Sequence, residues 1–107
     1  MAARLRAAER SGIDLRTTGI VIAQVWRDPA GRQVELARLL NAVEVMPLDR
    51  SMGPEAGVLL ARAGRGDAVD ATVVAAARTG DRIVTGDPVD IRALVAASNR
   101  AVYVVPC

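Results

Sequence analysis

Four aspartates in the C-terminal half of the sequence point most directly to chemistry. Asp67 and Asp70 precede an apolar run rich in Ala and Val, and Asp87 and Asp90 follow the hydrophobic segment Arg82–Thr85. Carboxylate oxygens are the ligands that Mg²⁺ and Mn²⁺ prefer in proteins. These ions activate water and stabilise charge during phosphodiester cleavage, so two or more converging carboxylates would suit that reaction.

Each of these aspartates also has a simpler structural interpretation. Asp67 and Asp70 are favoured residue types at the start of a helix, where a carboxylate caps free backbone N–H groups. Asp87 stands before Pro88, which is common in a turn or cap, and Asp90 would favour the dipole of a first helical turn. A shared metal therefore requires that the fold brings the carboxylates together.

The elements that must position these residues follow from hydrophobic periodicity and from turn signals. The pattern predicts helices over Ala2–Arg10, Gly19–Arg27, Gly31–Asn41, Pro54–Ala63, Asp67–Arg78 and Pro88–Ala97. It predicts strands over Ile13–Thr17, Val43–Leu48, Arg82–Thr85 and Ala101–Val105.

Strands that alternate with helices indicate an α/β fold with a parallel sheet and right-handed crossovers. In such sheets, sites form beyond the carboxyl ends of the strands. Asp87 follows a strand and Asp70 begins a helix. We therefore expect their side chains to share one rim of the sheet.

Composition limits the class of protein. The chain has 107 residues and a net charge of +2, so we expect one domain, and this charge does not by itself indicate nucleic-acid binding. With one Trp, one Tyr and no Phe, the core must consist of Ala, Val, Leu and Ile. Without His, and with Cys107 as the one cysteine, an internal disulfide and a Cys/His metal site are excluded. We expect a cytoplasmic protein with no membrane segment.

The segments around the aspartates resemble the C-terminal half of PIN-domain proteins of the VapC toxin type. The matching residues are Asp70-Ala71 at a helix start followed by Ala75–Ala77, then Gly80-Asp81 through Thr85 to Asp87 and Asp90. The similarity continues over Gly19–Arg27, Val43–Leu48 and the final segment Ala101–Val105. It covers essentially the whole chain and is more specific in the C-terminal half.

The resemblance implies a three-layer α/β/α PIN-like fold over residues 1–107 and a metal-dependent endoribonuclease. Such a protein is the toxin of a type II toxin–antitoxin pair, with RNA as substrate, a cognate antitoxin as partner, and Mg²⁺ or Mn²⁺ as cofactor. Asp70 and Asp87 would be catalytic metal-site residues, Asp90 and Asp67 further metal-site acids, and Thr85 a polar support. The resemblance also implies a homodimer.

Two departures from the family pattern affect this interpretation. Met1–Arg16 contains no hydrophobic strand ending in an aspartate, which in the family is the first and central strand. We therefore expect an N-terminally truncated domain in which two strand pairs face a gap, with exposed edges that invite association. In addition, Gln24 stands where the family usually has Glu; Gln keeps a carbonyl oxygen but lacks the charge.

These departures keep an alternative open, in which the chain is a catalytically inactive PIN-like remnant that binds an antitoxin or dimerises. A small nucleotide binder of receiver type ranks last, because Gly64–Asp67 is short and follows a predicted helix rather than a strand. Trp26 is interpreted as a core or dimer-interface residue rather than a platform for RNA bases.

Overall fold

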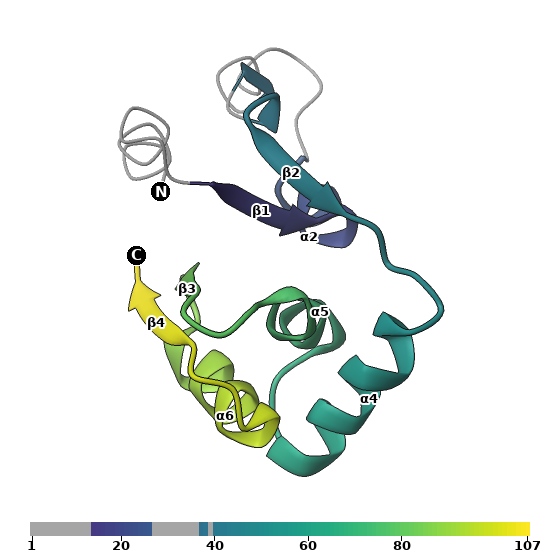
Figure 1. Ribbon diagram of the computed structural model, residues 1–107, viewed down its shortest axis with the longest axis vertical. Coiled ribbons are helices and arrows are strands. Elements are labelled where there is room, and N and C mark those ends of the chain that lie inside the picture. The colour runs from purple at the N-terminus through teal and green to yellow at the C-terminus, as the bar shows by residue number, and fades with distance from the viewer. Residues whose placement is uncertain (1–13, 27–36, 39) are drawn as a thin grey trace. The chain divides into compact units, whose positions relative to one another are not determined.

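A computed structural model describes residues 14–26, 37–38 and 40–107 of the chain (Figure 1). By its internal contacts the chain divides into two units, Met1–Pro47 and Leu48–Cys107. The expected single domain over the whole chain stays a prediction. The helix predicted over Ala2–Arg10 lies outside the described residues, as does most of the one predicted over Gly31–Asn41.

The described part of the N-terminal unit contains two strands and a short helix. These are β1 (Leu15–Thr18), α2 (Gly19–Val25) and β2 (Val43–Met46). The two strands pair in parallel, with Leu15 opposite Val43. The predicted strand Val43–Leu48 ends two residues early, and Pro47, which has no N–H to donate to a ladder, follows its last residue.

The C-terminal unit carries the remaining elements. They are α4 (Met52–Ala63), α5 (Ala68–Ala76), β3 (Arg82–Thr85), α6 (Pro88–Ser98) and β4 (Tyr103–Pro106). Strands β3 and β4 pair in parallel, and β4 packs against α6 (Figure 1). The prediction for β3 was confirmed at both ends. Helix α4 begins two residues before its predicted start, and α6 ends one residue after its predicted end.

Local side-chain and backbone signals set the helix ends in this unit. The Asp49 carboxylate accepts the N–H groups of Ser51 and Met52 at 3.0 Å, which satisfies backbone donors where α4 begins. Pro88 occupies the first turn of α6, where its missing N–H costs nothing. Helix α5 ends at Ala76 instead of the predicted Arg78, because the backbone becomes extended at Ala77.

Strand β4 is shifted towards the C-terminus relative to the predicted Ala101–Val105. Tyr103 N donates to Asp81 O at 2.9 Å and Cys107 N to Thr85 O at 3.0 Å. Alternate residues of a strand face opposite edges, so the nitrogen of Pro106 points away from β3 and no ladder bond is lost there. A proline on the outer edge also hinders further strand pairing.

The described residues thus form a mixed α/β structure with parallel strands and four helices, and its strands make two separate two-stranded sheets. The three-layer PIN-like arrangement stays a prediction.

The core of the C-terminal unit is aliphatic, as the composition predicts. Ala71, Val74 and Leu94 have no exposed surface, and Ile91 is 1% exposed. These residues bring α5 against α6, and the small side chain of Ala71 allows a close approach. The buried cluster comprises Ala56, Leu59, Ala71, Val74, Ile83, Ile91 and Leu94.

Arg100, in the connection between α6 and β4, binds to both α4 and α5. Its Nη1 donates to the carbonyl oxygens of Val74, Ala75 and Ala77 at 3.0 to 3.1 Å, at the C-terminal end of α5. Its Nη2 forms an ion pair with Glu55 of α4. A cation here gives donors to carbonyls at the end of the helix, among them that of Val74, which also accepts the N–H of Ala77, and complements the negative end of the helix dipole. Arg100 lies between α6 and β4, and its bonds to these carbonyls fix the C-terminal end of α5.

We expect Arg100→Met to lower the free energy of unfolding by about 1–3 kcal/mol, because partly buried carbonyls and Glu55 lose a charged donor. Urea denaturation followed by circular dichroism measures this loss. Arg92→Met, at an exposed position of α6, is the matched control and should cost less than about 0.5 kcal/mol. Equal losses in the two variants would contradict the role given to Arg100.

Candidate metal centre

Asp70 lies in the first turn of α5, beside the buried Ala71. The helix begins there because the Asp67 carboxylate accepts the backbone N–H of Asp70 at 2.8 Å. The structure thus gives Asp67 the capping role that its residue type suggests. Since Ala71 faces the core, the side chain of Asp70 is held half-buried at the edge of the α5–α6 contact.

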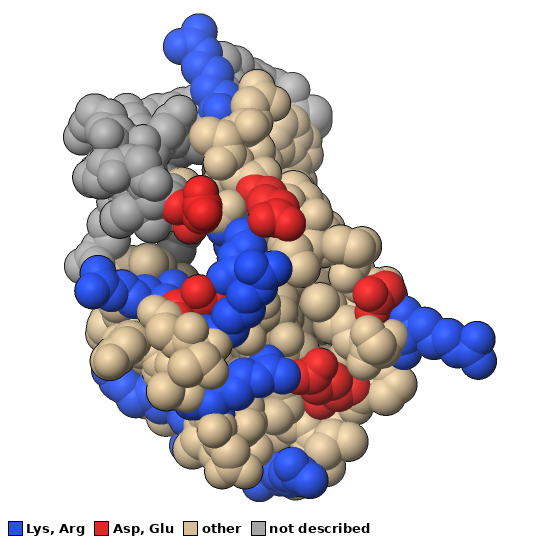
Figure 2. Space-filling model, in the orientation of Figure 1, with Lys and Arg blue, Asp and Glu red and all other residues tan. Residues whose placement is uncertain are grey.

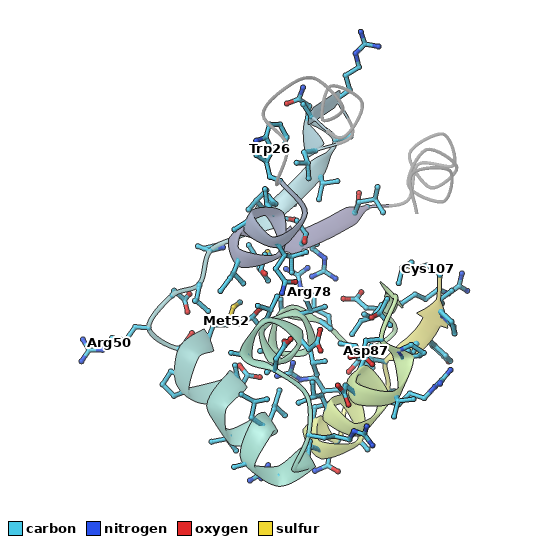
Figure 3. The ribbon with its side chains drawn as sticks, turned by 180° about the vertical axis from the view of Figure 1, so that it is seen from behind. Trp26, Arg50, Met52, Arg78, Asp87 and Cys107 are labelled. Carbon is cyan, nitrogen blue, oxygen red and sulfur yellow. The ribbon has the colours of Figure 1, made fainter. Side chains whose placement is uncertain are left out.

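Asp87 lies in the short connection from β3 to α6, where Figure 3 labels it. Its backbone N–H donates to Thr85 Oγ1 at 2.9 Å. Thr85 therefore fixes the backbone that carries Asp87, a contribution of the kind expected of a polar support. The Asp87 side chain is exposed. This agrees with its place just beyond the carboxyl end of a parallel strand, where sites form in such sheets.

Asp90 lies in the first turn of α6, one residue before the buried Ile91. Its Oδ1 accepts a hydrogen bond of 2.6 Å from Nε of Arg65, which lies between α4 and α5. The side chain of Asp90 is 23% exposed and that of Arg65 54% exposed. Asp90 is thus anchored both by its helix and by an arginine from a distant part of the sequence.

The fold brings three of the four predicted acids together. One carboxylate oxygen from each of Asp70, Asp87 and Asp90 lies within 4.8 Å of the others, and we call these residues the three-carboxylate cluster. Asp67 is not part of this cluster, and its role as a metal ligand stays a prediction. Gln24 is an exposed residue of α2, in the other unit of the chain.

Burial and neighbouring charges shift the pKa values of two acids of the cluster, Asp70 and Asp90. Burial raises the pKa of Asp70 above the ordinary value of 3.8, and repulsion from Asp67, Asp87 and Asp90 raises it further. The hydrogen bond from Arg65 lowers the pKa of Asp90, and a side-chain hydrogen bond with Asp87 adds to this effect. The pKa of Asp70 is therefore raised while that of Asp90 is lowered, although their carboxylate oxygens are neighbours.

The donor set fits a hard divalent cation. Three carboxylate oxygens from two helix starts and one strand end can converge on one ion, and Mg²⁺ is typically held by one or two carboxylates plus water and substrate oxygens. A bound cation would also relieve the repulsion that raises the pKa of Asp70. The three-carboxylate cluster could therefore hold a metal ion of this class.

Sequence reasoning missed the contribution of Arg65. The segment Gly64-Arg65-Gly66 is recognisable from sequence only as a helix stop, because its arginine reaches Asp90 through tertiary packing.

A cavity of about 300 Å³ lies between α4 and the C-terminal end of α6, and it shares no residue with the three-carboxylate cluster. Its lining residues are Pro54, Glu55, Val58, Leu59, Arg62, Ser98 and Arg100.

Comparison of the chain with protein-family models, curated proteins and solved structures gives no match. None of the helices in the described part of the chain combines the length and apolar character that a membrane crossing requires.

We expect Asp70→Asn to stabilise the metal-free protein at neutral pH. The folded-state pKa of Asp70 lies above 3.8, so the ionised carboxylate is disfavoured by folding. Its cost to stability is absent below that pH, develops as pH rises through the shifted pKa, and persists above it. Urea midpoints in EDTA at pH 7 and near pH 4 measure the difference, which should shrink at the lower pH. A variant less stable than the native chain at pH 7 would contradict this expectation.

Proposed function

We propose that this protein is a metal-dependent endoribonuclease and the toxin component of a type II toxin–antitoxin pair. In this proposal it acts in the cytoplasm on RNA with Mg²⁺ or Mn²⁺, forms a homodimer, and is inhibited by a cognate antitoxin. The observation that carries the proposal is the convergence of Asp70, Asp87 and Asp90 within 4.8 Å. The PIN-like sequence pattern around these residues supplies the reaction class.

Each acid of the cluster has a distinct part in the proposed reaction. Asp90, with its lowered pKa, stays ionised and offers a permanent anionic ligand. Burial and repulsion raise the pKa of Asp70, so its carboxylate holds a proton more readily than an ordinary aspartate does. Thr85 holds the backbone of Asp87 so that its carboxylate stays at the rim. Asp70, Asp87 and Asp90 would hold a divalent cation, which when bound would activate water and stabilise negative charge on the phosphate.

One observation favours the alternative, a catalytically inactive PIN-like remnant that acts as a binding or dimerisation module. Gln24 provides a neutral amide where the family pattern has an acid. A binding module needs no cation, whereas the nuclease does. Metal-dependent cleavage therefore separates the two functions.

We expect the purified protein to cleave single-stranded RNA when Mn²⁺ is added and to stop when EDTA removes the ion. Asp70→Asn and Asp87→Asn should each lower the cleavage rate by about 100-fold or more, because each removes charge that acts on the transition state. Gel analysis of a labelled RNA measures the rate.

Asp49→Asn is the matched control for these variants. It makes the same chemical change at an exposed aspartate outside the three-carboxylate cluster, and Asn keeps the oxygen that caps α4. Its cleavage rate should stay within about twofold of the native rate. RNA left intact by the native protein with Mn²⁺ would reject the nuclease and favour the binding module.

A further inference from the structure

The loop between α4 and α5 holds Arg65 in a defined place. Gly64 has φ 68° and Gly66 has φ 94°, in the left-handed region that favours glycine. A Cβ atom at Gly66 would lie 3.0 Å from Leu94 Cδ1 and 3.8 Å from Asp90 Cβ. Because Leu94 is fully buried and cannot yield easily, the loop packs directly against α6 beside Asp90.

The guanidinium of Arg65 has more donors than its bond to Asp90 uses. Its Nε donates to Asp90 Oδ1 at 2.6 Å, and the side chain is 54% exposed. A guanidinium carries five N–H donors in a planar fork that matches the oxygens of a phosphate group. Arg65 can therefore present donors to a ligand at the edge of the three-carboxylate cluster.

Local charge makes such a cation necessary for an anionic substrate. The C-terminal unit has as many Arg as Asp and Glu residues, and basic and acidic side chains lie interspersed on the face shown in Figure 2. A phosphodiester close to three carboxylates would be repelled unless cations lie beside them.

We propose that Arg65 is the phosphate-binding residue of this site, and that it exchanges Asp90 for the phosphodiester when a divalent cation binds the three-carboxylate cluster. This inference rests on the proposed function and adds a residue that contacts the substrate. Arg65 donates to Asp90 and so offsets part of the negative charge of the cluster. With a cation bound, Asp90 would serve as a metal ligand and the Arg65 guanidinium would be free to donate to the phosphate.

The exchange predicts two effects of opposite sign. Because Arg65 and the cation compete for Asp90, Arg65→Ala should tighten Mn²⁺ binding by about two- to fivefold, the small change expected for a partly exposed ion pair. Because the substrate loses a charge-assisted contact, kcat/KM for RNA cleavage should fall by about tenfold or more. Isothermal titration calorimetry gives the Mn²⁺ affinity without reference to activity.

Two further variants separate direct contact from net charge. Arg92→Ala removes the same charge from an exposed position two residues after Asp90 and should change both quantities by less than about twofold. Arg65→Lys keeps the charge but lacks the fork, so its kcat/KM should lie between those of the native protein and Arg65→Ala.

The outcomes distinguish this inference from the proposed function. Unchanged or weaker Mn²⁺ binding by Arg65→Ala, or equal shifts in Arg65→Ala and Arg92→Ala, would overturn the exchange while native cleavage left the nuclease intact. Native protein that binds Mn²⁺ without cleaving RNA would overturn the nuclease and the phosphate contact together. Tighter Mn²⁺ binding with reduced cleavage in Arg65→Ala alone would support the exchange.

Discussion

The packing of α5 against α6 is the constraint on which the candidate site depends. Ala71 and Leu94 are fully buried and Ile91 nearly so. Asp70 directly precedes Ala71, and Asp90 directly precedes Ile91. Each buried side chain therefore fixes a carboxylate at the boundary of the same contact. Aliphatic burial, at about 25 cal/mol per Å² of apolar surface, opposes the electrostatic repulsion that this proximity creates.

Two arginines support this arrangement from opposite ends. Arg100 gives its donors to the carbonyls that end α5, so it stabilises the helix that carries Asp70. Arg65 gives a donor to Asp90 and so reduces the negative charge of the cluster itself. The Arg100 side chain is 31% exposed, whereas that of Arg65 is 54% exposed. Arg100 thus serves the fold, and the role proposed for Arg65 toward a ligand depends on its greater exposure.

The parts of this structure that follow local rules could be predicted from the sequence. Asp67 and Pro88 mark helix starts, and strand β3 has a clear hydrophobic run, so the rim shared by Asp70 and Asp87 follows from topology. The contact between Arg65 and Asp90 could not be predicted, because it needs left-handed glycines and a specific packing of the loop on α6. The bounds of β4 depend on which strand edge faces β3, which periodicity alone does not reveal.

Hydrogen-bond partners explain why Asp90 lies in the three-carboxylate cluster and Asp67 does not, although both were predicted as further metal-site acids. Asp67 directs an oxygen to the N–H of Asp70, so part of its acceptor capacity serves the helix. Asp90 directs an oxygen to the guanidinium of Arg65, and this carboxylate belongs to the three-carboxylate cluster. One arginine offsets only one of three carboxylates, and burial together with repulsion then raises the pKa of Asp70. A divalent cation would supply the positive charge that a single arginine does not, which is why this cluster could hold a metal ion.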